Sequence, residues 1–143
     1  MKVLVISPGQ SPVPQEIDGT AESMREIVGG GLQAMYPSDD IALVFNKDGY
    51  VQHLPPNRGI LDAEGAFMEI IHGTFFLCGA PEDSNYFVSL TTEQVQHYMK
   101  VYASPEVFLN LGGRTIILPC GEDHPVANEN LLGHGWPNRL PDG

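Results

Sequence analysis

Short apolar runs, separated by glycine, proline and aspartate, recur along the chain and predict strands more often than helices. Val3–Ile6 is a continuous apolar run closed by a Pro-Gly pair, which is typical of a short buried strand. The segment 13–17 predicts an edge strand, because Pro14 has no backbone N–H to donate to a neighbouring strand. Further strands are predicted at Gly73–Cys78 and at Thr115–Leu118.

The middle of the chain has the pattern of a hairpin. Alternating apolar residues predict a strand over Leu32–Tyr36. Two more runs, Ile41–Phe45 and Tyr50–Leu54, flank the turn-forming segment Asn46–Gly49, so we expect them to pair through it. A second turn is expected at Asp62–Gly65.

The first predicted helix covers residues 20–29. Met24, Ile27 and Val28 recur at helical spacing and give it one apolar face. Glycines at 29–31 predict its end, because a helix C-terminus favours a residue that adopts positive φ.

The second predicted helix covers residues 91–103. Thr91 and Gln94 have the spacing of a capping box, and apolar residues follow at helical spacing. Ser104-Pro105 resembles an N-cap followed by proline at the first helical position, so a short third helix is expected through Phe108.

Two helices and several strands joined by hairpin turns predict a single α+β domain. We expect a largely antiparallel sheet with the two main helices packed on one face. The domain is expected over residues 1–119. Residues 120–143 are rich in Gly, Pro and Asn and are expected to form a C-terminal tail.

The charge of the chain is unbalanced. Its 143 residues include 18 acidic and only 7 basic side chains, which gives a net charge of -11. Binding of nucleic acid requires clustered lysine and arginine to neutralise phosphates, so nucleic acid is not expected as a partner.

The chain contains 2 cysteines, too few for a disulfide framework. The initial apolar run is shorter than a secretory signal, and no run has the length of a membrane span. We therefore expect a cytoplasmic protein with no membrane partner.

Arg58 is the first candidate for a ligand-binding residue. It follows Asn57 in a proline-stiffened segment, Leu54–Gly59, which predicts a loop. A guanidinium can bind a phosphate or carboxylate through two parallel hydrogen bonds. The alternative is a structural role, in which Arg58 pairs with an acid such as Asp62 or binds loop carbonyls.

His72 and Thr74 are the second candidates. They flank Gly73 at the start of a predicted strand and supply an imidazole and a hydroxyl as donors. They could bind a ligand, or they could mark a bend where the strand joins the sheet.

No catalytic or metal motif is present. Neither cysteine has a flanking base, and no serine lies in a nucleophile elbow. Cys120, Asp123, His124 and His134 are ligand types, but their spacing fits no standard zinc pattern. We therefore expect no metal, no cofactor and no enzymatic activity.

Six short motifs together resemble a known family. They are MKVLVISPG at the start, Asp18-Gly19, Tyr36-Pro37 with Asp40, Leu54–Arg58, Ile70–Gly79 and Phe87–Leu90. In this order they resemble domain-of-unknown-function family 3846, over residues 1 to about 103. The resemblance implies a small protein of a phage, plasmid or conjugative element, located in the cytoplasm of a bacterial host, and it assigns no catalytic residue.

Three functions are consistent with these features. The one we expect is counter-defence without catalysis, in which the protein sequesters a small anionic, nucleotide-type host signal through Asn57, Arg58, His72 and Thr74. The alternative is an acidic inhibitor that binds a host defence protein directly. A phosphodiesterase using His72 and Thr74 is the third, and it lacks a second positioned group. We also expect a homo-oligomer, because symmetric dimers are common and one small domain has little internal volume for a ligand.

Overall fold

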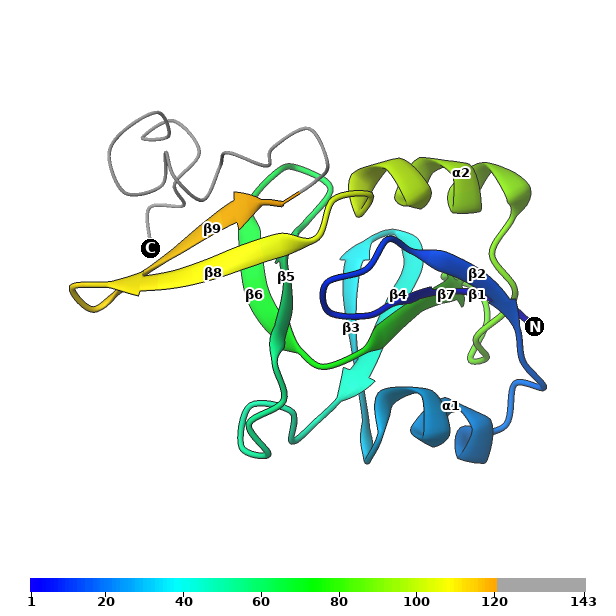
Figure 1. Cartoon of the computed structure of the whole chain (residues 1–143). Helices are drawn as coiled ribbons and strands as arrows, with labels where there is room; N and C mark the ends of the chain where they lie inside the picture. The colour runs from blue at the N-terminus through cyan, green and yellow to red at the C-terminus, as the bar shows by residue number, and fades with distance from the viewer. Residues whose placement is uncertain (121–143) are drawn as a thin grey trace.

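The computed structural model describes residues 1–120, and its elements form an antiparallel α+β fold (Figure 1). The elements are β1 (Lys2–Ile6), β2 (Val13–Glu16), α1 (Ala21–Val28), β3 (Leu32–Ser38), β4 (Asp40–Asn46), β5 (Pro56–Leu61), β6 (Phe67–His72), β7 (Phe75–Ala80), α2 (Thr92–Val101), β8 (Glu106–Leu111) and β9 (Arg114–Pro119). A five-stranded sheet has the order β2-β1-β7-β4-β3, and two-stranded ribbons are formed by β5–β6 and β8–β9. The α+β class and the antiparallel pairing predicted from the sequence are confirmed.

The two helices lie on opposite faces of the five-stranded sheet, so the prediction that they share one face is wrong (Figure 1). Met24 and Val28 of α1 pack with Ala42 and Val44 of β4. The alternate residues of β4 pack in a second cluster with Val95, Tyr98 and Met99 of α2. Burial on both faces explains the continuous apolar run of β4, because such a strand does not alternate apolar and polar residues.

The helix ends follow the capping signals in the sequence. The Thr20 side chain accepts a hydrogen bond from the Ser23 N–H at the start of α1, and Gly29 ends this helix at φ 81°. Thr91 and Gln94 form the expected capping box at the start of α2. Both predicted helices are therefore confirmed to within about two residues at each end.

Three local predictions are wrong. β4 pairs with β3 and β7, and residues 47–53 form turns, so no hairpin joins 41–45 to 50–54. The buried Asn46 side chain causes this turn: its Nδ2 donates to the Val28 carbonyl and its Oδ1 accepts from the Asp48 N–H.

The other two errors concern strands. The predicted loop at 54–59 contains most of β5, and the predicted third helix is replaced by β8. Residues 106–111 pair in register with β9, and this cross-strand contact outweighs the helix-start signal at Ser104-Pro105. The predicted tail lies outside the described residues, apart from Cys120.

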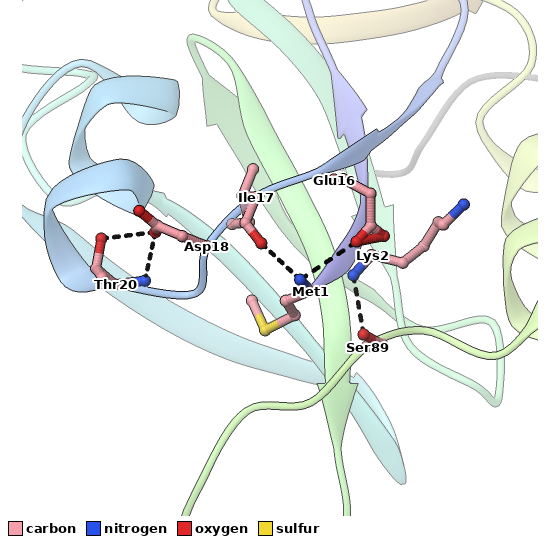
Figure 2. A network of polar contacts seen from close by, with 7 residues as sticks. All are labelled: Met1, Lys2, Glu16, Ile17, Asp18, Thr20 and Ser89. Atoms are coloured by element: carbon pink, nitrogen blue, oxygen red, sulfur yellow. Dashed lines mark hydrogen bonds and ion pairs between the residues drawn. The ribbon is translucent and has the colours of Figure 1, made fainter.

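A polar network ties the start of β1 to the approach of α1 and to the segment before α2 (Figure 2). The Met1 ammonium donates to the carbonyl of Ile17 and, at 3.4 Å, to Glu16 Oε1. The Lys2 N–H donates to Ser89 Oγ at 2.9 Å. The first strand is therefore connected to two segments distant in sequence.

Candidate functional site

The four residues predicted to bind a ligand are brought close together, at the point where β5 meets the β6–β7 turn. Asn57 is 1% exposed, and its Nδ2 donates to the carbonyl of Ile6 and to that of Gly73, each at 2.9 Å. One amide group thereby connects the end of β1, the start of β5 and the turn between His72 and Thr74.

Arg58 is fully buried beside it, with 0% exposure. Its Nη1 donates to Asn57 Oδ1 at 2.8 Å and to the Asn57 carbonyl at 3.2 Å. Its Nη2 donates to the carbonyls of Gln10 at 2.6 Å and Tyr102 at 2.9 Å. Burial lowers the pKa of Arg58, and the charges of Glu106 and Tyr102 oppose this effect.

The guanidinium thus joins β5 to the β1–β2 loop and to the C-cap residue of α2. A cation at this end of a helix interacts favourably with the helix dipole and binds a carbonyl that has no partner in the helix. Asp62, the acid considered as a partner of Arg58, instead accepts from the N–H groups of Glu64 and Ala66 through Oδ1. Arg58 therefore makes the contacts expected for the structural role, in which it binds backbone carbonyls.

Arg58 Nε is the one buried side-chain nitrogen or oxygen in residues 1–120 without a hydrogen-bond partner. It is enclosed by protein, so an external anion has no access to it in this conformation. The ligand role of Arg58 stays a prediction, and its visible role is to hold three elements together.

His72 and Thr74 point to different neighbours. His72 Nδ1 lies 3.0 Å from the Leu54 carbonyl, and its ring meets Tyr50 edge to face at 5.2 Å between centroids. Thr74 Oγ1 donates to Ser7 Oγ at 3.2 Å.

Gly73 between them has φ 88°, and an added Cβ would lie 2.7 Å from Leu54 Cδ1. This segment is a tight bend at which the chain passes from β6 to β7, and the bend requires glycine. The predicted ligand role of His72 and Thr74 also stays a prediction.

A groove at the C-terminal end of β3 was not predicted from the sequence. It has a volume of about 680 Å³ and lies between the β3–β4 turn, the β5–β6 turn and the segment after β7. We call it the acidic groove, after the carboxylates among its lining residues: Asp39, Asp40, Asp62, Glu64 and Glu82. Its described lining contains no lysine or arginine.

Two tyrosines border the acidic groove. Tyr36 is 58% exposed and Tyr86 is 77% exposed, so both rings present aromatic surface to solvent. Local hydrogen bonds shape the walls: Asp62 holds its turn, and Ser84 Oγ accepts from the Tyr86 N–H at 3.0 Å. The groove combines negative charge with exposed aromatic surface.

The sequence shows each acidic turn but not their proximity. Asp39-Asp40, Asp62 and Glu82-Asp83 each lie at a chain reversal, where acidic residues are common. Their convergence depends on the strand order, which places β3 and β7 on either side of β4. No group of three or more His, Cys, Asp or Glu side chains within residues 1–120 has the geometry to hold a metal ion.

Neither of the two helices in the described part of the chain is long and apolar enough to cross a membrane. Comparison with curated proteins and with solved structures gave no match. The family model "Domain of unknown function (DUF3846)" matches residues 1–103, which include every element from β1 to α2. The chain therefore belongs to the DUF3846 family.

Proposed function

We propose that this protein acts without catalysis as an inhibitor that binds a basic segment of a host defence protein in the acidic groove. The acidic groove carries this proposal, because its lining joins five carboxylates to two exposed tyrosines. The setting, counter-defence by a phage or other mobile element, comes from the resemblance described above.

The chemistry of the acidic groove selects for a cationic partner. Lysine and arginine side chains pair with carboxylates, and their charged heads are also attracted to the faces of tyrosine rings. The net charge of -11 adds a long-range field that speeds encounter with basic surfaces and repels anions. A surface loop or helix rich in arginine matches all three features.

Sequestration of a small anionic signal is less well supported. Its best donor, Arg58, is buried, and both of its terminal nitrogens already donate to protein oxygens. A nucleotide would have to displace these contacts and leave buried carbonyls without a donor, which is costly.

The first test is titration of the protein with a short fluorescent oligo-arginine peptide, followed by fluorescence anisotropy. Removing charge from the acidic groove with the double variant Asp39→Asn/Glu82→Gln is expected to raise Kd about tenfold. Tyr86→Ala is expected to weaken binding as well, through loss of aromatic contact.

A matched control removes the same net charge elsewhere. Glu22→Gln/Glu93→Gln changes exposed residues in the first turns of α1 and α2, away from the acidic groove. It should change Kd by about twofold at most. Equal weakening by both double variants would show nonspecific charge attraction. If the parent binds ATP and Arg58→Lys does not, sequestration of a nucleotide-type signal would be favoured instead.

A further inference from the structure

The two edges of the five-stranded sheet differ in how they are protected. The β2 edge contains Pro14 and charged Glu16, both of which discourage pairing with another strand. The β3 edge is seven residues long, and its sequence LQAMYPS contains no charged side chain in a chain that is 17% charged. Its single proline, Pro37, lies near the C-terminal end.

The ladder between β3 and β4 shows which backbone groups face outward. The Lys47 N–H donates to the Gly31 carbonyl at 2.9 Å, and the same register continues through Gln33↔Phe45 and Met35↔Leu43. Hydrogen-bonded pairs alternate in an antiparallel ladder, so the N–H and C=O groups of Leu32 and Ala34 point away from β4. Among the described residues, no other backbone group forms a hydrogen bond with these outward-facing groups.

The C-terminal end of this edge is closed differently. The Ala63 N–H of the β5–β6 turn donates to the Pro37 carbonyl at 2.8 Å. This contact caps the edge beside Pro37 and leaves Leu32–Tyr36 as the open stretch. Tyr36, within this stretch, is 58% exposed.

We propose that this open edge binds a second copy of the chain, with β3 pairing antiparallel to the partner's β3 around a twofold axis at Ala34. In this register Ala34 lies opposite the partner's Ala34, and Tyr36 lies beside the partner's Leu32. The outward backbone groups of one strand then meet the outward groups of the other, and the two sheets form one continuous sheet.

Symmetry and charge together favour a second copy as the occupant. Two molecules of net charge -11 repel each other over most of their surfaces, so close approach costs least where charge is absent. The neutral β3 edge satisfies this condition and is complementary to itself under twofold symmetry. The exposed Tyr36 gains a cross-strand apolar neighbour in the pair.

The pairing also affects the acidic groove, because Tyr36 belongs to both surfaces. The partner's Leu32 would border each groove beside Tyr36. The inference does not rest on the proposed function, since the backbone donors and acceptors of β3 carry it alone.

Sedimentation velocity on the 143-residue chain tests the pairing. We expect a mass twice the 15.6 kDa of one chain at high concentration, with dissociation on dilution. Ala34→Pro removes the central outward N–H without removing a bond to β4, and it should raise the dimer dissociation constant about tenfold or more. Ala34→Ser keeps this N–H and should dimerise like the parent. A parent chain that stays monomeric at high concentration overturns the proposal.

Amide hydrogen exchange tests the same contact without a substitution. The amides of Leu32 and Ala34 should exchange slowly at high concentration and rapidly on dilution, because only the second copy protects them. The Gln33 amide, bonded to β4 in the same chain, should stay slow under both conditions. Rapid exchange of Leu32 and Ala34 in a solution shown to contain dimers would place the interface elsewhere.

Discussion

Asp18 is an exposed residue whose carboxylate nevertheless has well-defined partners (Figure 2). Its Oδ1 accepts from the Thr20 N–H at 2.9 Å and from Thr20 Oγ1 at 2.8 Å. The Thr20 backbone bond, followed by side-chain bonds from Ser23 and Thr20, lowers the pKa of Asp18 from 3.8 to about 2. The ionised form therefore stabilises the approach to α1.

Replacing this carboxylate should make stability less dependent on pH. Because the pKa is lower in the folded state, the contribution of Asp18 is complete above its ordinary value of 3.8 and is lost as the pH falls through about 2. Asp18→Asn should lower Tm at neutral pH, and its Tm should approach that of the parent near pH 2. Thermal unfolding at a series of pH values measures this, and a deficit that grows on acidification would contradict it.

Asn57 and Arg58 show what single residues in the sequence can and cannot reveal. Their unusual pairing in a proline-rich segment was enough to single them out, and the structure brings them together with His72 and Thr74. Their partners could not be predicted, because Ile6, Gln10 and Tyr102 are 44 or more residues away from them along the chain.

Among the secondary-structure elements, those fixed by local contacts were the easiest to predict. α1 and α2 carry their capping residues within one turn of their ends, so short-range sequence identifies them. β5 pairs with β6 and β8 with β9, and the two ribbons meet where Glu106 Oε1 accepts from the Gly59 N–H at 2.8 Å, across 47 residues. Local propensity contains no information about such contacts, and both strands were mistaken for other structures.

Arg58 connects elements, so its removal should destabilise the whole fold rather than one loop. Arg58→Ala leaves the carbonyls of Gln10 and Tyr102 and Asn57 Oδ1 without this donor. The expected loss is about 3–5 kcal/mol in the free energy of unfolding, measured by urea denaturation.

Two further variants separate geometry from charge at this position. Arg58→Lys keeps the charge but lacks the planar fork, and it should recover only part of the loss. Arg25→Ala, at an exposed position in α1, should cost about 0.5 kcal/mol or less. If Arg58→Ala is as stable as Arg25→Ala, Arg58 does not hold these elements together.

On the scale of the whole described chain, residues 1–120, the five-stranded sheet has a separate apolar cluster on each face. One cluster contains Met24 and Val28 of α1, and the other includes Met99 of α2. The sequence shows a continuous apolar run at Ile41–Phe45 within β4, and this run is the signal for burial on both faces. The face that each helix covers depends on the order of the strands in the sheet and on the face to which each side chain points. Because that order joins strands far apart in sequence, it could not be predicted from short segments.

This arrangement predicts that damage to the two clusters is independent. Met24→Ala should cost about 2–4 kcal/mol, and the partly buried Met99→Ala about 1–2 kcal/mol. The sheet separates the two side chains and they share no cluster, so the double variant should lose the sum of both values to within about 0.5 kcal/mol.

Met24→Ala/Val28→Ala is the matched comparison, because these residues lie one turn apart on α1 in the same cluster. The two losses in this pair should depart from additivity by more than about 0.5 kcal/mol, since removal of either side chain loosens the site of the other. Urea denaturation of the parent, the two single variants and the double variant in each cycle gives both coupling energies. A coupling between Met24 and Met99 as large as that between Met24 and Val28 would mean that the helices share one core, as a sheet covered on one face would require.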